Sequence, residues 1–261
     1  MRLPAIKIFF SLWLLCSITM NAAGKSKPEY YQLETLYFST KQQEALIDQY
    51  LEKAYLPALH GYGLKNIGVF KPIANDTAAT KCVYVLIAFS SWKQVLEIGE
   101  KLQTNKDYQA KGTSFLGAAF DAPAYKRKEI TLLKAFSLAP KMAFPALTAP
   151  LADRVYELRS YESASDNLYR NKVQMFNEGG EVALFKRLGF NAIFYGDVVA
   201  GAKMPNLVYM TSFNSMADRN AHWDVFRNDP EWKALSGNPN YQHNVSKADI
   251  ILTRPAPYSD L

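Results

Sequence analysis

Two kinds of hydrophobic pattern alternate along the chain. Apolar and polar residues alternate over residues 30–38 and 154–161, as is typical of β-strands with one buried face. Each stretch is followed by apolar residues at helical spacing, from about Thr40 to Leu59 and from about Ala164 to Leu188. Both halves of the chain are therefore expected to begin with a strand and a helix.

The same succession continues in both halves. Further strands are predicted at Asn66–Lys71, Cys82–Phe89 and Glu129–Ala135, and at Asn191–Val199, Leu207–Phe213 and Asp249–Arg254. Ser91 and Ser215 follow the third strands and are suited to cap a second helix in each half. Each half then has the order βαββαβ, which is the ferredoxin-like arrangement of helices on one face of an antiparallel sheet.

An internal repeat accompanies this order. Tyr31-Gln32-Leu33-Glu34-Thr35 matches Tyr156-Glu157-Leu158-Arg159-Ser160, and Val83-Tyr84 matches Val208-Tyr209, both 125 positions apart. We therefore expect an α+β fold with tandem units at 28–138 and 153–256, joined by a linker at 139–152 that is rich in Pro and Ala. An open sheet needs cover on its second face, so the units are expected to form an intrachain pseudo-dimer, as two faced sheets or a closed barrel.

Both predicted first helices contain a breaker near their last turns. Pro57 lacks a backbone donor, and Gly179-Gly180 weakens a helix, so either can bend or interrupt it. One interpretation is a packing kink. The other is a mobile flap over a pocket.

The first residues are typical of an export signal. Arg2 and Lys7 supply positive charge, residues 8–20 are apolar, and Ala22-Ala23-Gly24 offers a small-residue cleavage site. We expect a signal peptide over residues 1–24 and a periplasmic or secreted mature protein. No later stretch is long and apolar enough to predict a transmembrane helix.

The cysteines and the charge distribution bear on lipidation, disulfide bonds and nucleic-acid binding. Trp13 and Leu15 are a poor match to the residues that precede a lipidated cysteine, so cleavage rather than lipidation is expected for Cys16. Cys82 would then remain alone in an apolar run, without an internal disulfide. The formal charge of +6 is interspersed along the chain, which argues against a nucleic-acid partner.

Several segments of the second half together resemble a NIPSNAP domain. They are Arg154–Tyr161, Leu188-Gly189-Phe190, Leu207–Met210 and residues 222–233, with His222-Trp223, Phe226-Arg227 and Asp229-Pro230-Glu231-Trp232-Lys233. The resemblance implies the dimeric α/β-barrel superfamily, which includes haem-degrading and cofactor-free monooxygenases, chlorite dismutases and proteins without known activity. Animal NIPSNAP proteins are mitochondrial and membrane-associated interaction proteins, so the export signal departs from the family's known setting.

Candidate chemistry centres on one histidine. None of His60, His222 and His243 has the spacing of a metal site, so no metal is expected. His222 is followed by Trp223 and shares a helical face with Phe226, whereas the repeat places Ile98 and Gly99 at the equivalent positions of the first half. His222 is the candidate catalytic residue, as a haem ligand or an acid–base group; its other interpretation is a surface or packing residue. No specific motif indicates haem.

Aromatic side chains and one arginine form the candidate ligand-binding set. It comprises Tyr156, Arg159, Tyr195, Tyr209, Trp223, Phe226 and Trp232. If a strand face with Tyr195 and Asp197, or with Tyr209 and Thr211, lines the barrel, it offers aromatic walls with hydroxyl groups. Arg159 either anchors a ligand carboxylate or, like Glu157 beside it, belongs to a solvated strand face or a cross-strand ion pair. Alternatively, these aromatic residues pack in the hydrophobic core and bind no ligand.

These observations leave three functions open. The first is a binding protein for a small aromatic or apolar molecule or for a protein partner. The alternative is an oxygenase-like enzyme, haem-dependent or cofactor-free, with Trp223 and Tyr209 shaping its pocket. The third is a structural envelope protein. A homo-oligomer is compatible with all three.

Overall fold

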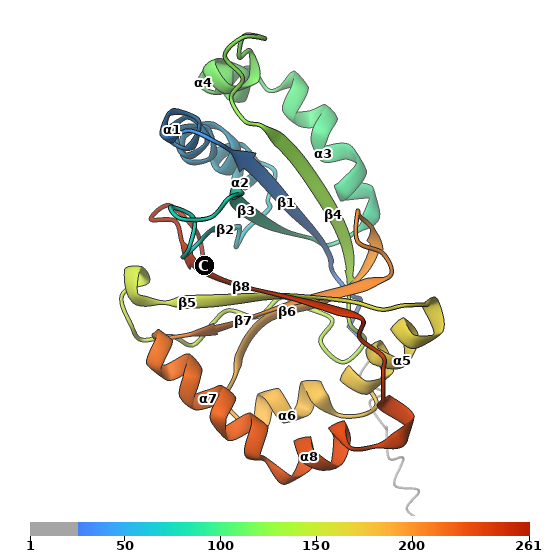
Figure 1. Ribbon diagram of the computed structural model, residues 1–261. Helices are drawn as coiled ribbons and strands as arrows, with labels where there is room; N and C mark the ends of the chain where they lie inside the picture. The colour runs from blue at the N-terminus through green and yellow to red at the C-terminus, as the bar shows by residue number, and fades with distance from the viewer. Residues whose placement is uncertain (1–25) are drawn as a thin grey trace, which may run out of the picture.

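Eight strands close into one antiparallel barrel with helices on two opposite sides, as Figure 1 shows. The computed structural model describes residues 26–261. The predicted signal peptide and Cys16 lie outside the described residues. Of the two arrangements expected from the sequence, faced sheets or a closed barrel, the chain adopts the closed barrel. No helix within residues 26–261 has the length and apolar character needed to cross a membrane.

The first half has the order strand, helix, two strands, helix, strand, with both helices divided. Its elements are β1 (Tyr30–Phe38), α1 (Lys41–Tyr50), a π-helical turn (Leu51–Tyr55), α2 (Leu56–Gly61), β2 (Gly68–Pro72), β3 (Lys81–Phe89), α3 (Trp92–Thr104), α4 (Lys106–Leu116) and β4 (Arg127–Ala135). β2 begins two residues later than predicted, because Asn66 has a left-handed backbone with φ 62° that cannot belong to a strand.

The second half repeats this order after a short 3-10 turn at Leu151–Asp153. Its elements are β5 (Val155–Glu162), α5 (Asp166–Phe176), α6 (Glu181–Arg187), β6 (Asn191–Ala200), β7 (Asn206–Phe213), α7 (Met216–Asn228), α8 (Pro230–Ser236), a 3-10 turn (Pro239–Tyr241) and β8 (Lys247–Pro255). The predicted caps are confirmed: the Ser91 and Ser215 hydroxyls accept from the backbone N–H groups of Gln94 and Asp218.

Both predicted helix breakers interrupt their helices. Pro57 has no N–H to donate one turn back, and the preceding turn widens into a π-helix in which the Leu56 N–H bonds to the Leu51 carbonyl. In the second half the helix ends at Phe176 and restarts after Gly180, whose φ of 95° only glycine adopts readily. Near Pro57 the helical run therefore continues with altered winding, whereas Gly179-Gly180 divides the corresponding helix of the second half into α5 and α6.

Two seams between the halves close the barrel. The strands are hydrogen-bonded in the order β1-β3-β2-β8-β5-β7-β6-β4, and β4 pairs again with β1. Each half therefore contributes four adjacent strands. β2 meets β8 with Phe70 opposite Pro255, and β4 meets β6 with Leu133 opposite Val198. The barrel has no free edge that could pair with another chain.

The barrel interior is filled at one end by aromatic residues. Tyr31, Phe70, Tyr156 and Phe194 pack there, and each is buried. The predicted linker at 139–152 runs across this end and places Met142 and Leu147 against the same cluster. Alternate residues on the strands face outward and pack under the two helical layers.

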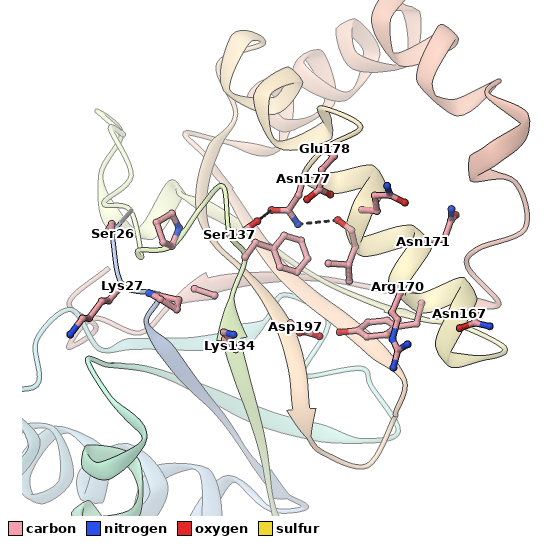
Figure 2. Close-up of a pocket in the computed structure, with 17 residues that line it drawn as sticks. Ser26, Lys27, Lys134, Ser137, Asn167, Arg170, Asn171, Asn177, Glu178 and Asp197 are labelled. Atoms are coloured by element: carbon pink, nitrogen blue, oxygen red, sulfur yellow. Dashed lines mark hydrogen bonds between the residues drawn. The ribbon is translucent and has the colours of Figure 1, made fainter. Parts of the chain in front are cut away.

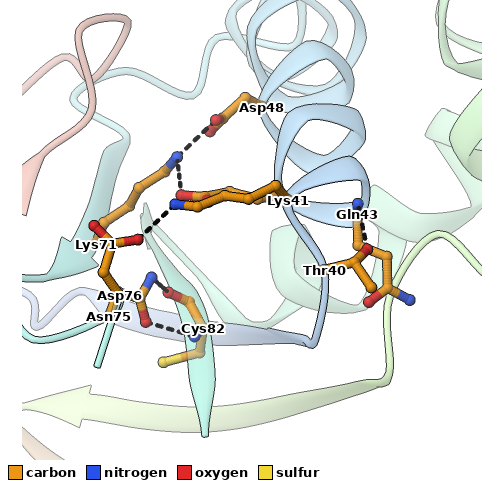
Figure 3. A network of polar contacts seen from close by, with 9 residues as sticks. Thr40, Lys41, Gln43, Asp48, Lys71, Asn75, Asp76 and Cys82 are labelled. Atoms are coloured by element: carbon orange, nitrogen blue, oxygen red, sulfur yellow. Dashed lines mark hydrogen bonds and ion pairs between the residues drawn. The ribbon is translucent and has the colours of Figure 1, made fainter. Parts of the chain in front are cut away.

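A polar network ties α1 to β2 and β3 (Figure 3). The Lys71 ammonium donates to Glu44 at 2.9 Å and Asp48 at 2.6 Å, both on α1. Asn75 donates to the Cys82 carbonyl at 2.9 Å and accepts from the Cys82 N–H at 3.0 Å, so its side chain closes the β2–β3 connection. These bonds hold the connection in one conformation.

Candidate functional site

A buried carboxylate lies between β5 and α7. Glu157 on β5 is fully buried and accepts from Arg159 Nε at 2.6 Å, Arg219 Nε at 2.7 Å and Trp223 Nε1 at 2.8 Å. Burial alone would raise the pKa of Glu157, but the Arg219 and Arg159 guanidinium groups outweigh burial and hold that pKa below its ordinary value. The partner of Arg159 is therefore a carboxylate of the protein itself.

Hydrogen bonds extend this network along the sheet. Arg159 donates to the Tyr161 hydroxyl at 2.7 Å, and that hydroxyl lies 2.9 Å from the Tyr209 hydroxyl. The Arg159 guanidinium also stacks on the Trp223 ring at 3.8 Å. Tyr195 stacks on Tyr209 with centroids 5.7 Å apart, and burial raises the pKa of Tyr209 well above its ordinary value. Burial raises the pKa of Tyr195 as well, so Tyr195 and Tyr209 are both neutral.

The space around the network is occupied by side chains. Lys172 and Glu181 form a buried ion pair at 2.9 Å, with the Lys172 ammonium 4.7 Å from the Phe176 ring. Four further aromatic residues complete the packing with Trp223 and Phe226: Phe176, Phe185, Phe190 and Phe213. The strand face with Tyr195 and Tyr209 therefore does not line the barrel interior, and it forms a packed core beneath α5 to α8.

Side chains alternate between the two faces of a strand, and this separates Tyr156 from the other predicted ligand-binding residues. Tyr156 faces the barrel interior, 4.8 Å from the Phe70 ring, whereas Arg159, Tyr195 and Tyr209 face the helices. Trp223 and Phe226 are buried in the same helical layer, and Trp232 packs on Phe226 at 4.4 Å. The structure therefore brings six of the seven predicted ligand-binding residues together and leaves Tyr156 elsewhere.

An open cavity lies at the end of this layer, beside α5. It has a volume of about 1090 Å³ and is called the α5 cavity here. Figure 2 shows α5 on one side and the N-terminal segment, β4 and β6 on the other. Its apolar lining includes Phe136, Val173, Pro28 and Pro140, while α5 contributes a polar face with Asn167, Arg170, Asn171, Gln174 and Glu178.

Charged groups of the α5 cavity are free of ion pairs within residues 26–261. They include the cationic Lys27, Lys134 and Arg170 and the acidic Glu178 and Asp197. Lys134 stands opposite Asp197 in the β4–β6 ladder. Burial raises the pKa of Asp197, although the Lys134 charge opposes that shift. The cavity thus combines an apolar wall with polar groups available to a ligand.

Sequence reasoning did not select the α5 cavity residues. Asn167, Arg170 and Gln174 share a helical face that, in sequence, has the composition of an ordinary solvated surface. The one signal was Gly179-Gly180, for which a mobile flap over a pocket was one interpretation. The break spans residues 177–180, and two of these residues, Asn177 and Glu178, line the cavity.

His222 lies outside the α5 cavity. Its Nδ1 is 2.9 Å from the Asp218 carbonyl and 3.1 Å from the Asp218 carboxylate. Its ring packs against Phe190 and Phe213 with centroids 5.5 and 5.6 Å away. These contacts engage Nδ1 and leave Nε2 as the nitrogen that could bind an iron. A haem would also need a space for the macrocycle beside Nε2, and His222 does not line the α5 cavity. The surroundings of His222 therefore do not fit haem.

The barrel and the helices that cover it are also found in known proteins. The antiparallel barrel with helices on two sides is of the dimeric α/β-barrel type. Residues 156–260, about two fifths of the chain, match the NIPSNAP family model. No curated protein matches this chain.

Three solved structures share the fold over nearly the whole chain. A candidate monooxygenase from Lactobacillus acidophilus is 10% identical, covers 88% of this chain and 94% of its own, and has a TM-score of 0.57. A second, from Fusobacterium nucleatum, is 6% identical over 88% and 93%, with a TM-score of 0.58. An anthrone oxidase-like protein is 10% identical over 89% and 93%, with a TM-score of 0.51. These identities establish a common fold alone.

Proposed function

We propose that this protein is a binding protein that holds a small, largely apolar or aromatic molecule in the α5 cavity. The observation that carries the proposal is the cavity itself: about 1090 Å³, apolar on one wall and polar on α5. Small-molecule sites are typically concave spaces of roughly 300–1,000 Å³ with apolar walls and a few polar groups that fix orientation. The α5 cavity has this size and composition.

The polar groups of the cavity suit recognition of a ligand's polar end. The Arg170 guanidinium offers a planar fork of donors, and the Gln174 carboxamide both donates and accepts. Neither side chain hydrogen-bonds to another group within residues 26–261, so a ligand need not displace an existing partner. Phe136, in contrast, is largely buried and forms part of the apolar wall.

A catalytic role has less support. The oxygenase-like alternative relied on His222, which is packed against Phe190 and Phe213 instead of lining the α5 cavity. The relatives named as monooxygenase or oxidase share only the fold, and unrelated activities occur on one fold. Binding without chemistry requires only the cavity.

We further infer that the chain is an exported protein made of two tandem copies of one domain, at 28–138 and 153–256. The repeat of Tyr31 and Tyr156, together with the same element order in each half, supports the duplication. The composition of residues 1–24 supports export. A protein partner or a further dimer is compatible with this arrangement.

The test compares two glutamine-to-tryptophan variants. Gln174 is exposed on α5 and lines the cavity, while Gln103 is exposed on α3 in the other half and does not. Native mass spectrometry of the purified protein and titration with the apolar fluorophore anilinonaphthalene sulfonate report occupancy. Gln174→Trp should fill the space and weaken binding at least tenfold, and Gln103→Trp should leave it unchanged.

Two results would reject the proposed function. One is the absence of both a co-purified molecule and saturable fluorophore binding by the wild-type protein. The other is equal binding by Gln174→Trp and wild type when circular dichroism shows that both are folded, because the fluorophore would then be bound elsewhere.

A further inference from the structure

A second, smaller cavity lies inside the end of the barrel opposite the aromatic cluster. It measures about 80 Å³ and is called the barrel-mouth cavity here. β1, β3, β4, β5, β7 and β8 all contribute to its wall, so both halves of the chain form it. Thr35, Thr131 and Ser160 project from three of these strands. These side chains are too short to fill an eight-stranded barrel, which explains the space.

One buried acceptor in this cavity has no partner. Asn206 is 3% exposed, and its Nδ2 donates to the Ser160 hydroxyl at 2.8 Å. Its Oδ1 is buried and accepts no hydrogen bond from residues 26–261. A buried carbonyl oxygen is destabilising unless it receives a donor. Whatever occupies the cavity must therefore carry an N–H or O–H group.

Two carboxylates give the cavity a negative bias. Glu129 and Asp249 come from the last strand of each half, β4 and β8, and both line the wall. Their cationic partners Arg127, Lys203 and Lys247 are 61%, 50% and 58% exposed, against 34% and 25% for the carboxylates. Solvent screens the outer charges more strongly than the inner ones. The two carboxylates therefore lie deeper than the cations that pair with them, one of which, Lys203, also lines the cavity.

The protein already places one primary ammonium at this rim. Lys203, on the loop between β6 and β7, brings its Nζ to 2.5 Å from the Asp249 carboxylate. The residues next to it, Gly201 and Ala202, also line the cavity. An ammonium group is thus compatible with the rim, and the loop that carries Lys203 lies at the entrance.

The inner wall is apolar and sets the size of a ligand. Leu33, Leu158, Val208 and Ile251 lie there. A cavity needs roughly 10–15 Å³ of such volume for each water, so this one holds several waters or a molecule of about four to six non-hydrogen atoms. A short alkyl chain with a donor at one end matches both surfaces.

We propose that the barrel-mouth cavity binds a short primary amine as its ammonium ion. The ammonium donates to Asn206 Oδ1 and lies near the Asp249 and Glu129 carboxylates, and the alkyl chain contacts Leu158 and Val208. This site is separate from the α5 cavity, and its occupancy does not depend on the function proposed above. Both halves of the chain are needed to build it.

The experiment uses three probes of nearly equal size at constant ionic strength. n-Propylammonium, n-propanol and propionate are titrated into the full chain, and binding is followed by isothermal calorimetry and by the NMR shift of the Asn206 side-chain amide. Propylammonium should bind at least tenfold more tightly than either other probe. Comparable affinities for all three, or a complex structure with ordered water only at Asn206, would overturn the proposal.

Variants locate the site. Asn206→Leu removes the acceptor with little change in size and should weaken propylammonium binding at least tenfold, whereas Asn228→Leu, on the exposed end of α7, should leave it unchanged. Asn206→Asp keeps the shape, adds a negative charge and should strengthen binding. If Asn206→Leu does not fold, the Asn206→Asp variant alone tests the proposal. Unchanged affinity in Asn206→Asp would also contradict the assignment.

Discussion

Replacing Glu157 by glutamine tests whether the buried network stabilises the second half. Glu157→Gln keeps the shape but removes the charge that Arg159 and Arg219 share. The carboxylate accepts four hydrogen bonds, one from Arg159, two from Arg219 and one from Trp223. A neutral carboxamide has one acceptor oxygen and would present an NH2 group to at least one of these donors.

The expected loss follows from the burial of the partners. Arg159 has a side-chain exposure of 12%, so water compensates little for the lost carboxylate. Removing one member of a buried ion pair costs about 3–5 kcal/mol, because the remaining charge stays buried and unpaired. For a domain of this size the melting temperature falls by roughly 2–4 °C per kcal/mol, which gives a decrease of roughly 6–20 °C.

Urea unfolding at neutral pH, followed by circular dichroism and tryptophan fluorescence, measures this loss. Glu178→Gln is the matched control, because Glu178 is exposed and makes no ion pair within residues 26–261. Its unfolding midpoint should equal that of the wild type. A Glu157→Gln loss below about 1 kcal/mol, the usual value of an exposed ion pair, would refute the reasoning.

The pH dependence provides a second check on the same variant. The pKa of Glu157 is lowered in the folded state from its ordinary value of 4.5. The stabilisation is therefore fully present above pH 4.5 and is lost as the pH falls through the lower folded-state pKa. The stability difference between wild type and Glu157→Gln should be widest at neutral pH and should narrow in acid.

Three further outcomes are expected. Gly180→Ala should destabilise by about 1–2 kcal/mol in urea unfolding because φ is 95°, whereas Gly61→Ala, with open space for a Cβ and no positive φ, should be neutral or stabilising; equal effects would contradict the strain argument. Cys82 is buried and burial raises the pKa of its thiol, so a thiol reagent should label it only after unfolding; rapid labelling of the native protein would be inconsistent. Lys172→Met should destabilise by about 3 kcal/mol by leaving Glu181 unpaired, and adding Glu181→Leu should recover most of the loss in thermal unfolding; no recovery would show that packing alone was lost.

Much of the fold was predictable because its signals are local. Strand alternation located β1 and β5, and the hydroxyl of Ser215 marked the start of α7. Pro57 and Gly180 indicated where the helices break, since their backbone restrictions act without tertiary context. The choice of a closed barrel was left open, because it depends on pairing between distant strands.

The site was predicted less well because its chemistry depends on which face each residue occupies. Tyr156 and Arg159 are three positions apart on β5 and therefore point to opposite sides of the sheet. Glu157 is buried although the sequence shows only a charged residue in a strand. Asn206 likewise has no distinguishing neighbours in sequence, and its unpaired oxygen emerges only when six strands surround it.

The seams of the barrel also have a consequence for biosynthesis. β2 is translated early, yet its edge is covered only when β8 and residues 256–261 reach it, with the Ala256 N–H bonded to the Val69 carbonyl. A nascent first half would therefore expose two unpaired edges, at β2 until β8 is made and at β4 until β6 is made. Two chains that meet in this state could exchange second halves, because each incoming half carries the same complementary edges. Chaperone protection before closure would favour the single-chain barrel over such swapped dimers.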